Sequence, residues 1–507
     1  MAKQKTGKRQ DFGISLIATG LCDLGVRSLS AYLKEKGYRT RVLFLNNNRR
    51  DYSRQALYEV GEVVKDSGII CISLLSLNIE KTKQLTNFLK KFKKPVIWGG
   101  CLVTTKPELC IEYTDILCIG EGEKALFDFA EKVRKGKNFF GTKNFWFRKD
   151  GLIIKNPPRP LIKNLDTLQF PEFIGKHYFL ENGRISTNIE NSFFCDHIVY
   201  GKQKAVFVYS QRGCVHNCSY CSNSKYRELY KGQCYIRRAS IKRLIEQLAE
   251  IKKKLHGLEY IYIYDDDFFG RPLKDIKEFS GKYSKLIGLP FHAYSTPATM
   301  DEEKLRLLIS AGLKDIDMGI QTGSERINKE LFNRGNHLNK EVFRAARVLN
   351  KYKKFLNPPL YDFILNNPFE TDNDLLETIG LLKKLPKPYF LFGHSLVFIP
   401  GTKLYEKGVN ERMIKDSFDL GMVETWLNPF AYFLKRKRNI YLNSLMCMMW
   451  GPITKKKYGI IPSQLIPLLT NKSVVRFMNL LSPFILLLGY AMPTPNRIYH
   501  LKKKLSG

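Results

Sequence analysis

The sequence predicts an α/β protein: an N-terminal doubly wound parallel sheet, then a partial (β/α)6 barrel, then a mostly helical C-terminal segment. Two observations indicate this fold class. Short apolar strands alternate with amphipathic helices over residues 11–137, and the alternation resumes with longer helices over residues 204–405. The alternation of strands and helices is absent between these two stretches and stops after residue 405. We therefore expect a connector at 138–203 and a helical cap or membrane-proximal segment at 406–507.

The first sheet is predicted from short apolar runs, and its first helix from a run between about Val26 and Lys36 that Gly37 ends. The expected strands are Phe12–Ala18, Arg41–Leu45, Ile69–Leu74, Pro95–Trp98 and Asp115–Ile119. Apolar strands separated by helices indicate a parallel sheet that is covered on both faces. Such sheets bind ligands at the carboxyl ends of their strands.

Small residues gather at these expected carboxyl ends. They are Ser73 and Ser76, Gly99 and Gly100, and Gly120, Glu121 and Gly122. Glycine lets a bulky ligand approach the backbone, although each pair could also be a tight turn. Three clusters on one edge favour a binding site there.

The barrel is predicted from six further strand and helix units. The expected strands are Ala205–Ser210, Tyr260–Asp265, Phe291–Ser295, Asp315–Ile320, Tyr361–Leu365 and Phe390–Phe398. The expected helices are Ser240–Leu255, Leu273–Leu286, Asp301–Ala311, Asn339–Tyr352 and Thr371–Leu385. Ser240 and Thr371 are good N-caps for two of them. A barrel of this kind has its active site at the carboxyl face of the strands.

Charge and cysteine content limit the partners and the compartment. The chain has 83 Lys and Arg against 48 Asp and Glu, a net charge of +35. The lysines are spread over every segment, so a lysine-rich composition explains this charge better than a nucleic-acid site. Eleven cysteines with uneven spacing do not resemble a disulfide framework, which favours the cytoplasm.

The termini contain no predicted targeting or spanning segment. Met1–Gln10 is basic with no apolar run behind it, and the longest apolar stretch, Met478–Met492, is interrupted by Ser482 and Pro483. A spanning helix needs about 20 apolar residues. Apolar stretches and basic clusters alternate in 406–507, which suits either a cap over the barrel mouth or peripheral contact with an anionic membrane.

Three cysteines, Cys214, Cys218 and Cys221, follow the first barrel strand closely. Thiolate sulfur favours zinc or an iron–sulfur cluster. Structural zinc normally takes four protein ligands, and His216 or Cys234 could be the fourth. Three cysteines on a [4Fe–4S] cluster instead leave one iron with a free coordination site, where chemistry can occur.

This loop resembles the CxxxCxxC motif of the radical S-adenosylmethionine (SAM) superfamily, with Tyr220 as the aromatic residue before the last cysteine. The resemblance implies a [4Fe–4S] cluster that binds S-adenosylmethionine and cleaves it to a 5′-deoxyadenosyl radical. Asp265-Asp266-Asp267-Phe268 stands where the subgroup has a DD motif, which implies that Asp265 or Asp266 receives the methionine amino group.

Two later stretches continue the resemblance. Gly319 to Ser324 looks like the GIESGS stretch that meets the ribose and carboxylate, with Gln321 where Glu is more usual. The resemblance implies that Gln321 and Ser324 bind the cofactor. Ile364 to Thr371 resembles the GxPGET turn near the adenine, with Asn366 where Gly is usual.

The N-terminal unit is similar to the cobalamin-binding domain of cobalamin-dependent radical enzymes. The likeness rests on Pro95 to Gly100 and on Asp115 to Glu123. A DxHxxG motif, whose His would ligate cobalt, is absent, because Asp23-Leu24-Gly25 contains no His. The radical subgroup likewise holds cobalamin without a protein His ligand, so cobalamin is an expected cofactor.

Together the resemblances imply a methyltransferase that acts on an unactivated carbon. The alternatives are ring closure or oxidation with the same cofactors, a radical enzyme whose cobalamin-like domain is empty, and a basic binding protein with structural zinc. The resemblance also implies a small-molecule substrate and an electron donor such as flavodoxin or ferredoxin. The aromatic and apolar character of 406–507 favours a hydrophobic substrate.

Overall fold

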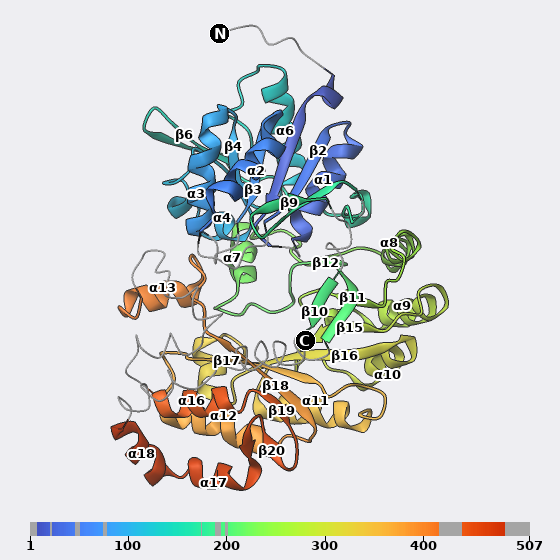
Figure 1. Ribbon diagram of the computed structural model, residues 1–507. Coiled ribbons are helices and arrows are strands. Elements are labelled where there is room, and N and C mark those ends of the chain that lie inside the picture. The colour runs from blue at the N-terminus through green and yellow to red at the C-terminus, as the bar shows by residue number, and fades with distance from the viewer. Residues whose placement is uncertain are drawn as a thin grey trace.

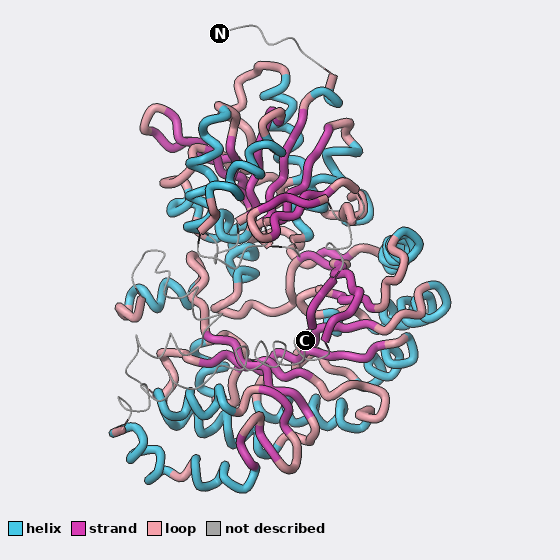
Figure 2. The backbone as a smooth tube through the Cα atoms, in the orientation of Figure 1, coloured by secondary structure: helices cyan, strands magenta, loops and turns pink. Residues whose placement is uncertain are grey.

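The computed structural model describes residues 8–20, 23–45, 51–74, 79–173, 175–187, 194–197, 201–414 and 439–481. Figures 1 and 2 show two α/β bodies, one above the other, with helix α7 (Ser222–Leu229) between them. The upper body contains the N-terminal sheet, and the lower body contains the barrel strands. The α/β fold class with two successive sheets is confirmed.

The N-terminal body is built on a nine-stranded sheet with the order β7-β6-β5-β4-β3-β1-β2-β8-β9. Its parallel centre is made of β1 (Gly13–Ala18), β2 (Arg39–Phe44), β3 (Ser67–Ser73), β4 (Val96–Gly99) and β5 (Ile116–Cys118). Its helices are α1 (Leu24–Glu35), α2 (Arg54–Val64), α3 (Ile79–Leu89), α4 (Cys101–Thr105), α5 (Pro107–Cys110) and α6 (Glu123–Arg134).

Helices cover both faces of this sheet, as the continuous apolar strands predict. Apolar residues of α2, α3 and α4 pack on one face, and those of α1 and α6 pack on the other. Successive residues of β3 divide between the two cores: Ile70 faces the first and Ile69 the second. The carboxyl ends of the strands are left as a free edge toward the barrel.

The segment expected to be a plain connector adds strands to both edges of the sheet. Strands β6 (Phe145–Lys149) and β7 (Leu152–Lys155) form a hairpin beside β5, and β8 (His177–Glu181) and β9 (Arg184–Ser186) form another beside β2. The apolar alternation missed β7 because Leu152 is 72% exposed on this outer strand.

The second body is a ten-stranded sheet whose six parallel strands form the partial barrel. They are β11 (Gly201–Val208), β14 (Tyr260–Ile263), β15 (Phe291–Ser295), β16 (Leu313–Gln321), β17 (Leu360–Leu365) and β18 (Tyr389–Ser395). The helices are α8 (Ile241–Lys254), α9 (Leu273–Leu286), α10 (Glu302–Ala311), α11 (Asn339–Lys351) and α12 (Asp372–Lys384). Strand β10 (Phe194–His197) pairs antiparallel with β11, and β12 (Gln211–Arg212) pairs with β13 (Arg237–Arg238).

The two faces of the barrel sheet differ in character. Alternate residues such as Ala293, Met318 and Phe363 pack against the surrounding helices in the largest apolar core. The residues between them point to the opposite, inner face, because side chains alternate along a strand. This inner face carries polar and aromatic side chains, among them His292 and Asp317.

The described part of the C-terminal segment contains helices and a small antiparallel addition to the barrel sheet. The helices are α13 (Lys403–Asn410), α16 (Ile440–Met448), α17 (Ile466–Leu469) and α18 (Lys472–Leu480). Strands β19 (Gly451–Ile453), β20 (Lys457–Tyr458) and β21 (Ile461–Pro462) continue the sheet beyond β18, which the helical expectation missed. Among all the residues described, no helix has both the length and the apolar content to cross a membrane. The longest apolar stretch of the sequence falls mostly outside these residues.

Candidate active site

The three cysteines Cys214, Cys218 and Cys221 share one loop between β12 and α7. Their thiols are free, and Cys214 and Cys218 are buried. Burial raises the pKa of Cys214 and Cys221 to about 12, so these thiols keep their protons at neutral pH until a metal replaces them. Arg334 donates to the Cys218 sulfur over 3.4 Å, and Asn223 donates to the Cys221 sulfur over 3.7 Å. The loop therefore already has donors directed at sulfur.

The two side chains considered as a fourth zinc ligand have other partners. The exposed Cys234 lies 3.3 Å from the backbone oxygen of Ile236, and His216 contacts Asp267. Within the described ranges, no three His, Cys, Asp or Glu side chains are grouped to hold one metal ion. A [4Fe–4S] cluster requires a different arrangement of ligands, because each thiolate binds a different iron. The three sulfurs therefore need not converge on one metal ion.

The entrance to the loop is held by Asp265, which is fully buried. Its carboxylate accepts hydrogen bonds from the backbone N–H groups of Ser210 over 2.6 Å and Gln211 over 2.9 Å, and from the Ser210 hydroxyl. The next turn requires Gly213, because its φ is +86° and a Cβ there would lie 2.6 Å from the backbone oxygen of Tyr235. These contacts fix where the chain turns into the cysteines.

The three consecutive aspartates therefore have different tasks. Asp265 is saturated by the backbone of the loop entrance, and Asp267 turns away to contact His216. Asp266 lines a cavity that it shares with the carboxyl edge of the first sheet, and it accepts a hydrogen bond from Asn223 over 3.1 Å. Burial, with the neighbouring carboxylates, raises the pKa of Asp266, so a cationic ligand would be favoured there. Of the two residues predicted to receive the methionine amino group, Asp266 is the one that faces open space.

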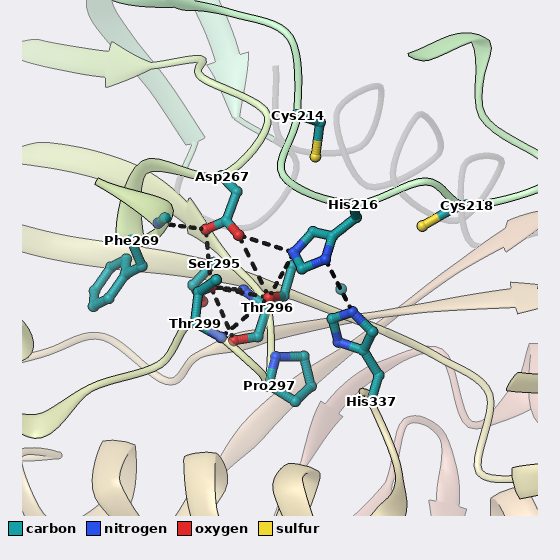
Figure 3. Close-up of polar contacts among 12 residues, drawn as sticks. Cys214, His216, Cys218, Asp267, Phe269, Ser295, Thr296, Pro297, Thr299 and His337 are labelled. Carbon is teal, nitrogen blue, oxygen red and sulfur yellow. Dashed lines mark hydrogen bonds and ion pairs between the residues drawn. The ribbon is translucent and has the colours of Figure 1, made fainter. Parts of the chain in front are cut away.

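His216 links the cysteine loop to the barrel (Figure 3). Its Nε2 lies 3.0 Å from Asp267 Oδ2 and 3.1 Å from Thr296 Oγ1, and its Nδ1 lies 3.3 Å from His337 Nε2. Burial lowers the pKa of His337 to about 2, so that imidazole is neutral at pH 7. Asp267 also accepts from Thr299 over 2.9 Å. The sequence offered no signal for this arrangement, which positions the middle of the loop over the ends of β14 and β15.

Tyr220 packs against the barrel side of the loop and does not line the cavity that Asp266 faces. Its ring meets Phe332 edge to face at 4.9 Å, and its hydroxyl lies 3.3 Å from the Arg334 guanidinium. Arg334 is 5% exposed and also donates to the backbone oxygen of Gly319 over 2.6 Å. Arg334 thus joins Tyr220 and Cys218 to strand β16, a role that no sequence motif indicated.

The Gly319–Ser324 stretch places its two predicted cofactor residues differently. Gln321 has φ +75°, a strained value for a residue other than glycine, and its side chain lies over Gly319. Ser324 is fully buried, and its hydroxyl donates to Asp374 over 2.5 Å. Burial alone would raise the pKa of Asp374, but hydrogen bonds from Arg326 and Ser324 lower it to about 2. The hydroxyl of Ser324 is therefore already used to hold the start of α12.

The structure explains why asparagine can stand at Asn366. Its φ is +58°, in the left-handed region that glycine and asparagine enter most readily. Its side-chain amide donates to Ser395 Oγ over 2.7 Å, and its backbone N–H donates to Asn443 over 2.9 Å. Further along the same turn, burial raises the pKa of Glu370 to about 8. The departure from glycine thus preserves the shape of the turn.

The predicted binding edge of the N-terminal sheet opens into a cavity of about 510 Å³. The residues of this edge that line it are Ser73, Gly99, Gly100, Gly120, Glu121 and Gly122, whereas Ser76 lies outside the described residues. The barrel side of the cavity includes Tyr209, Gln211 and Asp266. The cavity thus lies between the carboxyl edge of the first sheet and the cysteine-loop side of the barrel, a position typical of ligand sites.

Glu121 also joins the two bodies. Its carboxylate accepts from Arg212 and from Arg237 over 2.8 Å each, and from the backbone N–H of Ile162 over 3.0 Å. Arg212 additionally contacts Glu123 over 2.5 Å. Burial alone would raise the pKa of Glu121, but the two guanidinium groups hold it below its usual value. Arg212 and Arg237 were not identified from the sequence, because nothing local to them indicates a partner about 90 residues or more away.

Two family models match the chain. The Radical SAM superfamily model matches residues 208–382, and the B12 binding domain model matches residues 16–130. An uncharacterized methyltransferase of Pyrococcus horikoshii is 25% identical over 323 residues, which is 63% of this chain and 64% of that protein. The cytidylyl-2-hydroxyethylphosphonate methyltransferase of Streptomyces wedmorensis is 22% identical over 61% of this chain and 63% of its own. The chain thus spans slightly less than two thirds of these relatives.

Solved structures share the fold. The radical S-adenosylmethionine methyltransferase TsrM from Kitasatospora setae, solved with cobalamin and a [4Fe–4S] cluster, superposes with a TM-score of 0.61. The match covers 80% of this chain and 75% of TsrM at 14% identity. The cobalamin-dependent S-adenosylmethionine radical enzyme OxsB matches with a TM-score of 0.56 and 15% identity, over 84% of this chain and 56% of OxsB.

The residues present fit the groups that these domains imply. A radical SAM domain implies a [4Fe–4S] cluster and S-adenosylmethionine, and the loop offers three free thiols with a carboxylate, Asp266, that lines the adjoining cavity. A B12-binding domain implies cobalamin, and Gly100 forms part of a glycine-lined edge. With φ +98°, a Cβ at Gly100 would lie 2.9 Å from the backbone of Leu74. The chain therefore contains an N-terminal B12-binding domain followed by a radical SAM domain.

Proposed function

We propose that this protein is a cobalamin-dependent methyltransferase that transfers a methyl group to an unactivated carbon of a small molecule. The observation that carries the proposal is the single cavity lined by the predicted cobalamin edge and by Asp266 beside the cysteine loop. Chemistry that uses both cofactors requires them to face one space, and this arrangement supplies it. Both curated relatives are named as methyltransferases, which supports the same reaction class.

In this proposal each part of the chain positions one reactant. When bound, the cluster and S-adenosylmethionine supply the deoxyadenosyl radical, and cobalamin supplies the methyl group. Cys214, Cys218 and Cys221 hold the cluster, and Asp266 receives the methionine ammonium. Gln321 and the backbone around Ser324 bind the ribose side of S-adenosylmethionine, and Tyr220 supports Cys218 through their shared contact with Arg334. The residues of the N-terminal edge form the cobalamin side of the site; they are Ser73, Ser76, Gly99, Gly100, Gly120, Glu121 and Gly122.

The proposal includes a cytoplasmic location and a low-potential electron donor such as flavodoxin or ferredoxin. The free cysteines of the described residues support a reducing compartment. Peripheral contact with an anionic membrane is also proposed for the C-terminal segment. Its support is a set of apolar side chains on α17 and α18: Leu468, Phe477 and Leu480 are 61%, 60% and 80% exposed.

The test is anaerobic reconstitution of the full chain with iron, sulfide and cobalamin, followed by reduction and addition of methyl-labelled S-adenosylmethionine. We expect 5′-deoxyadenosine and label in cobalamin or in a small-molecule product. Cys214→Ala, Cys218→Ala and Cys221→Ala should each lose the visible absorbance of the cluster, whereas Cys110→Ala, a buried cysteine of the first domain, should keep it. Deoxyadenosine without methyl transfer would favour ring closure or oxidation, and an intact cluster without deoxyadenosine would refute the proposal.

A further inference from the structure

The inner face of the barrel carries a group of ionisable side chains that the cofactors do not explain. His292 and Tyr294 lie on β15, Asp317 on β16, Asp362 on β17 and His394 on β18. His292 Nε2 lies 3.3 Å from Asp317 Oδ1, and His394 Nε2 lies 3.7 Å from Asp362 Oδ1. These two imidazole–carboxylate pairs lie on neighbouring strands, because β16 pairs with β17 and Asp362 lies beside Gly319, two residues beyond Asp317.

Several polar atoms of this group have no hydrogen-bond partner among the described residues. Both ring nitrogens of His292 and the Oδ1 of Asp317 are buried without a hydrogen bond, because the 3.3 Å contact between His292 Nε2 and Asp317 Oδ1 does not meet hydrogen-bond geometry. The two residues are only 1% and 8% exposed. Asp315, two residues earlier on the same face of β16, contrasts with them. Its carboxylate accepts from Asn357 over 2.8 Å and from the Tyr260 hydroxyl. A buried polar atom without a hydrogen bond is unfavourable, and a bound ligand that supplies the hydrogen bond would remove that cost.

The group lies directly beneath the cysteine loop. Thr296, which contacts His216 of the loop over 3.1 Å, follows β15 on the same alternating face as Tyr294 and His292. At about 3.3 Å per residue, Tyr294 lies about 7 Å and His292 about 13 Å below Thr296 along the strand. A molecule bound at His292 and Asp317 would therefore reach up toward the loop.

The chemistry of the group selects an organic cation. Within the described residues the four His and Asp side chains are not grouped to bind one metal ion. The two carboxylates, Asp317 and Asp362 on adjacent strands, would instead be stabilised by a larger cation between them. Aromatic rings surround the position: the ring centroid of Tyr294 is 4.6 Å from that of His292 and 5.4 Å from that of Tyr264. Aromatic faces and carboxylates together suit an alkylammonium group.

We propose that the inner face of the barrel is the substrate subsite, and that the substrate carries an amino or guanidino cation held between Asp317 and Asp362. This inference rests on the proposed function, because it assigns the substrate class of the same reaction. The tyrosines Tyr264 and Tyr294 contact the apolar part of the substrate, and the cation anchors it. The carbon to be methylated then lies nearer the loop than the anchored nitrogen.

The test is calorimetric binding to the anaerobically reconstituted, unreduced full chain, so that turnover plays no part. The probes are benzylamine, which is protonated at pH 7, benzyl alcohol and benzoate. We expect benzylamine to bind about tenfold or more tightly than benzyl alcohol, and benzoate not to bind, because one charge-assisted hydrogen bond gives a difference of that order. If the wild-type protein binds benzylamine and benzyl alcohol equally, or binds benzoate more tightly, the proposal is refuted.

Variants locate the site. Asp317→Asn and Asp362→Asn should each weaken benzylamine about fivefold or more and leave benzyl alcohol unchanged, because each removes one charge and little volume. Asp115→Asn, at an exposed aspartate of the first domain, is the matched control and should change neither. Wild-type affinity for benzylamine in both barrel variants would refute the assignment. Failure to form deoxyadenosine would refute the proposed function alone, since probe binding requires no S-adenosylmethionine cleavage.

Discussion

Replacing Glu121 by alanine should uncouple the two bodies and destabilise the protein strongly. Arg237 is 5% exposed at its side chain and would keep two neutral backbone oxygens as described acceptors, that of Ile162 at 3.0 Å and that of Tyr235 at 3.4 Å. Removing one partner of a buried ion pair costs about 3–5 kcal/mol, because the remaining charge stays out of water. Arg212 is 27% exposed and retains Glu123, so its loss adds less.

A urea titration followed by tryptophan fluorescence measures this effect, with each transition fitted separately. With a slope of about 2 kcal/mol per molar urea, the loss moves the midpoint by about 1.5–2.5 M. The double variant Glu121→Gln, Arg237→Met should recover most of the stability, because it leaves no unpaired charge on Arg237. Glu250→Gln, in an exposed pair with Lys254, is the control and should change stability by less than about 0.5 kcal/mol. A Glu121→Ala loss no larger than the control's would refute the reasoning.

Three further predictions follow from single contacts. Burial raises the pKa of Glu370 to about 8. The contribution of its protonated form to the free energy of unfolding is therefore fully present below the ordinary pKa of 4.5 and is lost as pH rises through about 8. Urea midpoints should therefore fall between pH 5 and pH 8 in the wild type and fall less in Glu370→Gln; an equal fall would contradict this. Gly120→Ala should lower the free energy of unfolding by more than about 1 kcal/mol, because the φ of Gly120 is +77° and the new Cβ would lie 1.9 Å from the Tyr230 hydroxyl. In thermal unfolding, adding Tyr230→Phe should restore only part of this loss, because the strained φ remains. Asp266→Asn should weaken S-adenosylmethionine binding in equilibrium dialysis and leave the iron content of the protein normal. Asp265→Asn should instead lower the iron content, because Asp265 holds the entrance to the cysteine loop. The reverse pattern would show that the roles of the two aspartates are interchanged.

Much of the fold could be predicted because strand and helix periodicity is a local property. The strand expected at Phe291–Ser295 and the helix expected at Leu273–Leu286 have these bounds in the structure. Of the four strands that the apolar runs missed, β7 and β9 are the outermost of the sheet, and β7 exposes Leu152. The other two, β6 and β8, bury Phe145 and Phe179 as inner strands. Their pairing with β5 and β2 is decided by contacts distant in the chain.

The candidate site likewise has one part that could be predicted from the sequence and another that could not. The spacing of Cys214, Cys218 and Cys221 specifies a three-thiolate loop without reference to anything distant, since all three lie on one short segment. Three consecutive aspartates, by contrast, look alike in sequence. Which of them faces the cavity depends on Ser210 and Asn223, which reach Asp265 and Asp266 from more than 40 residues away.

The sequence by itself therefore determined the order of the domains, the strand ends that carry polar residues, and the cysteine loop. Only the tertiary structure decided that Glu121 joins the bodies through Arg212 and Arg237, and that His292 pairs with Asp317 on the inner face of the barrel. The physical reason is that a local motif reports backbone propensity and ligand chemistry within a few residues. Charge pairing and burial depend on which strands become neighbours when the cores pack.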